Sequence, residues 1–155
     1  MKEIYLMRHG KADGYHLYAD DFFRPLIERG QNDVLKAAIE LRKHTKIDCI
    51  LASPSVRTAM TARIVANLFE LKAENILFKT ELYNSGVTEY LKCLEDIKKF
   101  KILLLGHNPS IAQLGMQFAN GEDVFKTSEI LGFQHDSTNL ALNTSTATIF
   151  SHLRR

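Results

Sequence analysis

Residues 8 to 10 place an arginine, a histidine and a glycine side by side, directly after the apolar run Ile4-Tyr5-Leu6-Met7. Arginine offers a planar fork of hydrogen-bond donors that suits a phosphate, and histidine can act as a base or a nucleophile. Glycine lets the backbone approach a ligand closely. The same three residues are also ordinary at the end of a strand, where glycine stops the strand and charged side chains face solvent. The tripeptide alone does not decide between a site and a surface turn.

Two further apolar runs end in residues of the same chemistry. Residues 48–52 lead through Ser53-Pro54 to Arg57, and "KILLLGH" ends at Gly106-His107. Parallel strands point the same way, and ligands of α/β sheets bind beyond the carboxyl ends of the strands. Taken singly, the arginine reads as a solvated charge and the histidine as a loop residue. Taken together, the strand ends predict a pocket for a dianion such as phosphate, formed by four residues: Arg8, His9, Arg57 and His107.

The elements that would carry these residues alternate between strands and helices. Apolar runs predict strands over residues 3–7, 48–52, 76–78 and 101–106, and two more within residues 130–152, with "HDSTN" between them as a loop or helical turn. Helical spacing predicts helices over residues 31–43, 87–97 and 110–120, and another with Ser53 as N-cap and Pro54 at its first position. The sequence therefore predicts an α/β fold: a mostly parallel central sheet with helices on both faces, in a single domain over residues 1–155.

The composition narrows the class of protein and its partners. The chain has 155 residues, with 20 basic and 18 acidic side chains and a net charge of +2. This balance argues against nucleic-acid or membrane-surface binding, which needs a clustered basic surface. We recognise no signal peptide and no membrane span, and Cys49 and Cys93 read as buried, reduced thiols. We expect a cytoplasmic monomer.

The sequence lacks the patterns typical of a Walker-type nucleotide site and of a metal site. Gly10 stands alone, so the glycine-rich loop of a Walker-type site is missing. Arginines beside the two histidines would repel a metal cation, and no cluster of acidic residues supplies further ligands. We expect no metal and no cofactor.

Three segments, in this order, resemble the signatures of the histidine phosphatase superfamily, whose fold is phosphoglycerate mutase-like: "LMRHG", "LASPSVRTAMTA" and "LLLGHNPS". The short length, "RPLIERG" after the first motif and the lack of an inserted cap resemble the SixA-type phosphohistidine phosphatases. The resemblance implies that neutral His9 attacks phosphorus and that water hydrolyses the resulting phosphohistidine. It also implies that Arg8, Arg57 and a protonated His107 hold the phosphoryl oxygens. Met60 stands where the family often has a polar residue, and we expect this to affect packing.

The resemblance also directs attention to a missing acid. Esterases of the superfamily usually carry a carboxyl group two residues after a leucine in a loop beyond the second motif. In the matching loop, "TELYNSG", Leu82 places Asn84 at that position. An amide cannot protonate an alkoxide, whereas phosphohistidine releases imidazole, whose pKa is roughly 6.5. The sequence therefore favours phosphohistidine on a partner protein, such as a His-containing phosphotransfer domain.

Two other functions stay open at this point. One is a small-molecule phosphomonoesterase with Glu81 as its acid, and the other is a phosphate-binding adaptor without catalysis. Three residues beyond the central four are expected to contact the substrate: Arg24, Gly10 and Asn84. Arg24, in "RPL", would add a cation at the mouth of the pocket, or would only form an ion pair within its loop.

Overall fold

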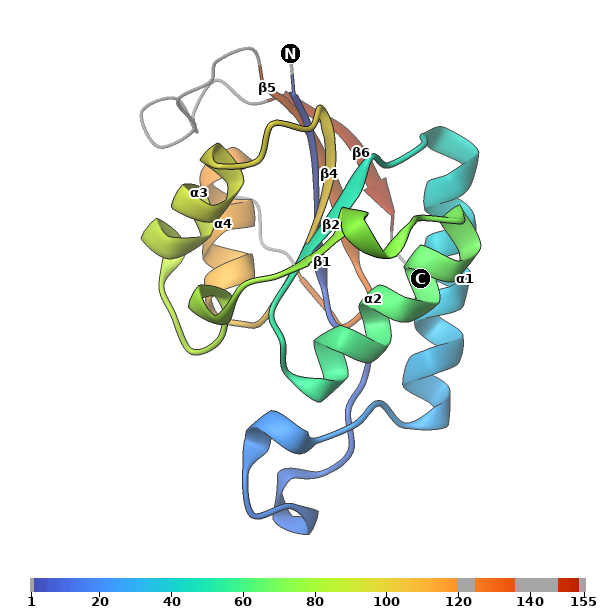
Figure 1. Cartoon of the computed structure of the whole chain (residues 1–155), viewed down its shortest axis with the longest axis vertical. Coiled ribbons are helices and arrows are strands. Elements are labelled where there is room, and N and C mark those ends of the chain that lie inside the picture. Colours follow the sequence, from blue (N-terminus) through green and yellow to red (C-terminus); the bar gives the residue numbers. More distant parts are fainter. Residues whose placement is uncertain (1, 120–124, 136–147, 154–155) are drawn as a thin grey trace.

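A computed structural model describes residues 2–119, 125–135 and 148–153, and its strands form one six-stranded sheet (Figure 1). The order across the sheet is β3-β2-β4-β1-β5-β6. Neighbours from β3 to β1 pair in parallel, while β5 pairs antiparallel with both β1 and β6. The strands are β1 (Lys2–Arg8), β2 (Cys49–Ala52), β3 (Ile76–Phe78), β4 (Lys101–Gly106), β5 (Ile130–His135) and β6 (Thr148–Leu153). The predicted α/β fold with a mostly parallel sheet is confirmed.

Helices cover both faces of the sheet, two on each (Figure 1). α1 (Glu28–His44) packs beside α2 (Val56–Phe69) on one face, and α3 (Val87–Glu95) packs beside α4 (Ser110–Phe118) on the other. Two short 3-10 turns, η1 (Tyr15–Leu17) and η2 (Asp21–Phe23), lie in the loop between β1 and α1. None of the described helices is long and apolar enough to cross a membrane.

The central strand β1 is buried on both faces because helices cover both faces of the sheet. Ile4 and Leu6 pack into the core beneath α3 and α4, while Tyr5 and Met7 pack into the core beneath α1 and α2. All four side chains are fully buried. Burial of one large apolar side chain contributes about 1.5–3 kcal/mol, and a slip of one residue would exchange the two faces. The apolar run therefore fixes the point at which Arg8 leaves the sheet.

The start of α2 differs from the predicted one. The sequence predicts Ser53 as N-cap, but α2 begins at Val56 with Ser55 as N-cap. The hydroxyl of Thr58 lies 2.6 Å from the carbonyl oxygen of Ser53 and 2.9 Å from that of Ser55. These contacts hold residues 53–55 as a turn in front of the helix, so the predicted start is wrong. The side chain of Ser53 is left free to contact another part of the chain.

The other predicted elements are confirmed with small shifts at their ends. The first helix begins at Glu28 instead of residue 31, and α4 ends at Phe118. The two strands predicted in the tail are β5 and β6, and the loop predicted between them lies outside the described residues after His135. Cys49 and Cys93 are buried free thiols, as predicted.

Gly106, at the end of β4, leaves no room for a side chain. A Cβ atom added there would lie 2.5 Å from Cε1 of Tyr90 and 2.7 Å from its hydroxyl oxygen. That hydroxyl donates to the carbonyl of Leu82 (3.0 Å) and accepts from the amide of His107 (3.1 Å). We predict that Gly106→Ala lowers the free energy of unfolding by about 1–3 kcal/mol, as measured by urea denaturation. A change under about 0.5 kcal/mol would show that Tyr90 moves aside without cost.

Candidate active site

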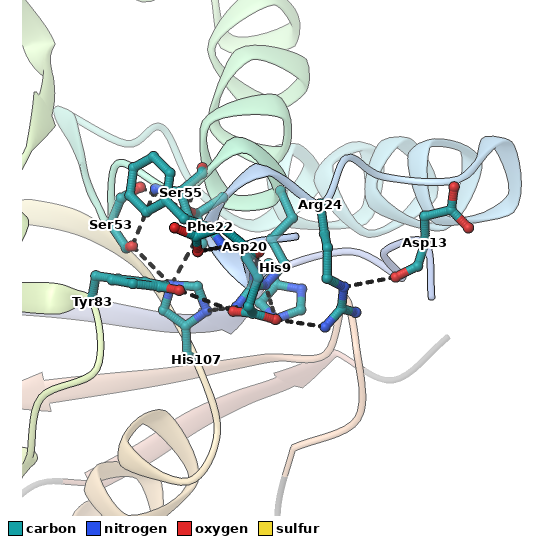
Figure 2. A network of polar contacts seen from close by, with 12 residues as sticks. His9, Asp13, Asp20, Phe22, Arg24, Ser53, Ser55, Tyr83 and His107 are labelled. Atoms are coloured by element: carbon teal, nitrogen blue, oxygen red, sulfur yellow. Dashed lines mark hydrogen bonds and ion pairs between the residues drawn. The ribbon is translucent and has the colours of Figure 1, made fainter. Parts of the chain in front are cut away.

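The carboxyl ends of three neighbouring strands bring the candidate residues together. Arg8 in β1 pairs with Gly106 in β4, and Ala52 in β2 pairs with Leu105. Hydrogen bonds extend this pairing past the strands: the amide of His9 donates to Gly106 (3.3 Å). His9, Ser53 and His107 thus lie close together at one edge of the sheet (Figure 2).

Arg57, in the first turn of α2, connects these strand ends through one buried guanidinium group. Its Nε donates to Nε2 of His9 (3.3 Å), and one terminal nitrogen donates to Nδ1 of His107 (3.2 Å). The same terminal nitrogen contacts Oδ2 of Asp21 at 2.8 Å, and the other donates to the carbonyl of Asp21 at 2.8 Å. The Arg57 side chain is only 7% exposed. One cation therefore joins β1, β4 and the loop that contains η2.

His9 is held as a neutral ring with an unprotonated Nε2. Its Nδ1 lies 2.7 Å from the carbonyl oxygen of Gly10, so this nitrogen carries the proton, and Nε2 accepts from Arg57. Burial lowers the pKa of His9 to about 3; the Gly10 carbonyl opposes this shift, and the charges of His107, Arg57 and Arg8 add to it. A neutral imidazole with an unprotonated Nε2 is the form that can attack phosphorus.

Gly10 orients His9 through its backbone. Its carbonyl accepts from the His9 ring, and its amide donates to the hydroxyl of Thr61 (3.1 Å). An added Cβ would lie 2.6 Å from Cγ2 of Val34 and 2.9 Å from the carbonyl oxygen of Gly30, so the packing requires glycine. These contacts position the His9 ring and occupy the Gly10 amide, while a direct contact between Gly10 and substrate stays a prediction.

His107 faces the site from the end of β4 and is also neutral. Its Nε2 lies 2.8 Å from the hydroxyl of Ser53, and its Nδ1 accepts from Arg57. Burial lowers the pKa of His107 to about 4, with a further contribution from the charge of Arg57. The ring is therefore neutral without substrate, whereas the expected protonation of His107 concerns the phosphate-bound site. A bound dianion would have to raise this pKa before Nδ1 could donate to it.

Arg8, at the end of β1, has a guanidinium nitrogen that is available to a ligand. Its Nε is buried and has no hydrogen-bond partner among the residues that the structure describes. Burial and the nearby charge of Arg57 both lower the pKa of Arg8, yet a guanidinium remains charged at physiological pH. A buried donor without a partner is costly, so an anion that reached Arg8 would be favoured.

Two residues that sequence reasoning overlooked complete the pocket, Asp21 in η2 and Tyr83 after β3. The Tyr83 hydroxyl donates to Oδ2 of Asp21 (3.1 Å), and its ring lies edge-on to His107 at 5.5 Å and to Phe22 at 5.1 Å (Figure 2). In the loop that contains Asp21 the sequence pointed to Arg24, and in the loop that contains Tyr83 it pointed to Glu81 and Asn84. No local pattern distinguishes Asp21 from its neighbour Asp20.

Arg24 forms the ion pair that was one of its two predicted roles. Its guanidinium donates to Oδ1 of Asp21 (2.7 Å) and, through Nε, to the carbonyl of Asp13 (2.8 Å) (Figure 2). The Arg24 side chain is 17% exposed. It therefore lies at the mouth of the site and keeps its loop folded, while a contact with substrate stays a prediction.

The loop after β3 separates its two candidate residues. Asn84, in the left-handed backbone region (φ 52°), shares with His107 the wall of a hollow of about 310 Å³. Glu81 is exposed, and hydrogen bonds from its own amide and from Thr80 lower its pKa, so it is ionised at neutral pH. Asn84 thus lies near His107, and its contact with substrate stays a prediction, while Glu81 is not set to act as an acid.

Two remaining expectations concern packing and metals. Met60 packs against the core beneath α1 and α2, and its sulfur accepts from the amide of Leu26 (3.3 Å), which fits the packing effect expected for this departure. In the part of the chain that the structure describes, no three His, Cys, Asp or Glu residues gather closely enough to hold a metal ion.

Comparisons with known proteins agree with this geometry. The Histidine phosphatase superfamily (branch 1) matches residues 4–78. An uncharacterised protein of Picosynechococcus sp. (strain ATCC 27264 / PCC 7002 / PR-6) is 27% identical over 150 residues, covering 92% of this chain and 90% of that protein.

Solved structures extend the likeness to nearly the whole chain. The protein histidine phosphatase SixA in complex with tungstate is 25% identical with a TM-score of 0.79, over 97% of this chain and 96% of that one. A protein of Agrobacterium tumefaciens assigned to the SixA phosphohistidine phosphatases has a TM-score of 0.83 at 22% identity, over 99% and 98% of the two chains. The chain thus matches the histidine phosphatase superfamily over residues 4–78 and shares the fold of the SixA structures over nearly its whole length.

These matches indicate the class of reaction but leave the substrate open. The protein is a phosphatase, which is a class of hydrolase. A phosphoserine phosphatase of Entamoeba histolytica, at 13% identity, shares the fold with a TM-score of 0.68 and covers 100% of this chain and 98% of that one. At that identity the likeness shows the fold alone.

We predict that His9 stays neutral in weakly acidic solution. Its pKa is lowered to about 3, so the neutral form is retained as the pH falls well below the ordinary histidine value of about 6.5. A nitrogen-15 NMR titration from about pH 7.5 to about pH 5 should show no protonation of Nε2, while a histidine peptide in the same buffers titrates fully. Protonation of His9 near pH 6.5 would contradict its burial and cationic surroundings.

We predict that Arg57→Ala lowers kcat/KM for p-nitrophenyl phosphate about a hundredfold, equivalent to about 3 kcal/mol of transition-state stabilisation. Arg57→Lys keeps the charge but loses the fork that spans both histidines, so it should recover only part of the loss. Arg63→Ala, on the exposed side of the same helix, is the matched control. An effect of Arg57→Ala below threefold would place Arg57 outside the chemistry.

Proposed function

We propose that this protein removes the phosphoryl group from phosphohistidine on a partner protein, with His9 as the nucleophile. The observation that carries the proposal is the protonation state of the site. A neutral His9 faces cationic donors, but neither candidate carboxyl group is protonated. Burial alone would raise the pKa of Asp21, yet hydrogen bonds from Arg57 and Arg24 outweigh it and hold this pKa below its ordinary value. Glu81 is exposed and ionised.

The leaving group decides whether such a site can work. An alkoxide needs a proton from an acid as its bond to phosphorus breaks. Imidazole in phosphohistidine can carry that proton in advance on its other nitrogen, because a reference pKa of about 6.5 leaves a substantial fraction of the rings protonated near neutral pH. A site without a protonated carboxyl group therefore suits a phosphoramidate and poorly suits a sugar or alkyl phosphate.

In the first step, the lone pair on Nε2 of His9 forms the new bond to phosphorus. The bond between phosphorus and the substrate nitrogen breaks, and its electron pair stays on that nitrogen. The substrate ring, already protonated on its other nitrogen, leaves as neutral imidazole. In this proposal Arg8, Arg57 and His107 hold the phosphoryl oxygens, which is supported by the unpartnered Nε of Arg8 and by the contacts of Arg57 with both histidines. Positioning and charge stabilisation supply most of the catalysis in phosphoryl transfer.

In the second step, water attacks the phosphorus of phosphorylated His9. The bond from phosphorus to Nε2 breaks, and its electron pair returns to Nε2. The Gly10 carbonyl keeps the proton on Nδ1 throughout, so the ring of His9 again leaves as a neutral imidazole. The water oxygen and both its protons depart with the phosphoryl group as dihydrogen phosphate.

A partner protein as substrate is supported by the mouth of the site and by a relative. Two short turns border the mouth, where the Asp21 side chain is 42% exposed. A protein histidine phosphatase is 25% identical to this chain. A His-containing phosphotransfer domain presents phosphohistidine on its surface and is the partner class we favour. The monomeric state and the cytoplasmic location stay predictions.

We predict that His9→Ala abolishes turnover of a phosphohistidine-bearing phosphotransfer domain, because the proposed nucleophile is lost. Labelled substrate mixed with the native protein should yield an acid-labile, alkali-stable phosphoenzyme, and the variant should yield none. His44→Ala, an exposed histidine near the end of α1, is the matched control. Circular dichroism of the variant checks that it remains folded.

Three outcomes would replace this proposal. Labelled phosphoenzyme in His9→Ala would rule out His9 as the nucleophile. Rapid hydrolysis of an alkyl phosphate, lost in Glu81→Gln, would establish the phosphomonoesterase. Tight phosphate binding without any phosphoenzyme would establish the adaptor.

A further inference from the structure

Asp21 places a carboxylate inside a pocket that suits an anion. Its Oδ2 accepts from Arg57 (2.8 Å) and from the Tyr83 hydroxyl (3.1 Å), and its Oδ1 accepts from Arg24 (2.7 Å). Its backbone carbonyl accepts a further hydrogen bond from Arg57. No other carboxylate among the described residues forms a hydrogen bond or ion pair with Arg57.

This carboxylate is charged and can be reached by a ligand. Hydrogen bonds from two arginines keep it ionised, although burial opposes the charge. Its side chain is 42% exposed, whereas that of Arg57 is only 7% exposed. A carboxylate has about four acceptor positions, and three side-chain donors occupy three of them. Oδ1, which accepts only from Arg24, retains capacity for another donor.

An anion in this position works against the binding of a phosphoryl dianion. Asp21 and the phosphoryl group would share the guanidinium of Arg57, and their like charges would repel each other. An asparagine or a serine at this position would also accept a hydrogen bond from Arg57, and neither would add this repulsion. During the reaction the negative charge becomes an advantage when another part of the substrate is positive.

The proposed substrate has such a part, since phosphohistidine departs most readily when its ring is protonated and carries a positive charge. We propose that Asp21 is a specificity residue whose carboxylate accepts a hydrogen bond from the N–H of the departing imidazole of phosphohistidine. This inference rests on the proposed function and concerns the same site.

The interaction gives the two imidazoles of the first step matching partners. On His9, the ring proton on Nδ1 is held by the carbonyl of Gly10. On the substrate, the ring proton on the nitrogen away from phosphorus would be held by Asp21. No proton moves: Nε2 of His9 gains the bond to phosphorus, the substrate nitrogen keeps the electron pair, and both rings retain their protons. Asp21 thus favours the protonated ring without acting as an acid.

An ester with an anionic leaving group should respond to Asp21 in the opposite sense. p-Nitrophenyl phosphate releases a phenolate, which carries no N–H and develops negative charge as it departs. Asp21 repels that charge, so its removal should leave this reaction unchanged or accelerate it. The ratio of the two reactions therefore isolates the effect of Asp21 on the leaving group.

The test compares kcat/KM for a phosphohistidine peptide and for p-nitrophenyl phosphate. We expect Asp21→Asn to lower the ratio of the first to the second about tenfold or more, since a hydrogen bond to a charged group is lost only with phosphohistidine. Asp20→Asn removes the same charge one residue earlier and keeps an acceptor for the amide of Phe22, so its ratio should match that of the native protein. Asp21→Ser, a second neutral variant, should lower the ratio as well.

The outcomes separate this inference from the proposed function. If Asp21→Asn and Asp21→Ser slow both substrates by the same factor, Asp21 only holds Arg57 in place and the inference is overturned, while the proposed function stands. If the ratio rises, the carboxylate opposes phosphohistidine and the inference is likewise overturned. If the native protein cleaves esters but not the peptide, the proposed function fails first and the inference with it.

Discussion

The site depends on the burial of one guanidinium group. A buried cation is costly unless hydrogen bonds and opposite charge surround it, and removal of one partner leaves the rest of that cost unopposed. Arg57 meets this requirement with three partners that come from separate elements: His9 after β1, His107 after β4, and Asp21 in η2. Because the guanidinium of Arg57 needs all three partners, it holds two strand ends and a loop in a single arrangement.

The same cation determines the state of the two histidines. Burial disfavours a charge on either ring, and Arg57 donates a hydrogen bond to a ring nitrogen of each. Each ring must therefore keep that nitrogen unprotonated, and the opposite nitrogen carries the proton toward Gly10 or Ser53. The tautomers follow from local contacts and are set before any substrate arrives. A site arranged in advance avoids reorganisation during the reaction, which is a main source of electrostatic catalysis.

The sequence predicted those parts of the fold that depend on local patterns. Continuous apolar runs identified the central strands, and the shared direction of parallel strands predicted which edge their polar ends would share. The start of α2 was missed because the Thr58 hydroxyl contacts the backbone carbonyls in front of the helix. Asp21 was missed because its partners are distant in sequence: Arg57 lies 36 residues away and Tyr83 lies 62. Secondary-structure propensity and residue spacing within a loop do not predict contacts with residues so distant in sequence.

The balance of charge explains why the site combines arginines, neutral histidines and a carboxylate. Arg8, Arg57 and Arg24 contribute three positive charges, Asp21 contributes one negative charge, and both histidines are neutral. Two positive charges remain, which match the two negative charges of a phosphoryl dianion. Protonated histidines would bring the pocket to four positive charges, and the nucleophile would lose its lone pair. The carboxylate thus moderates the attraction that the arginines create, and the low pKa values of His9 and His107 keep that balance over the range in which phosphate is a dianion.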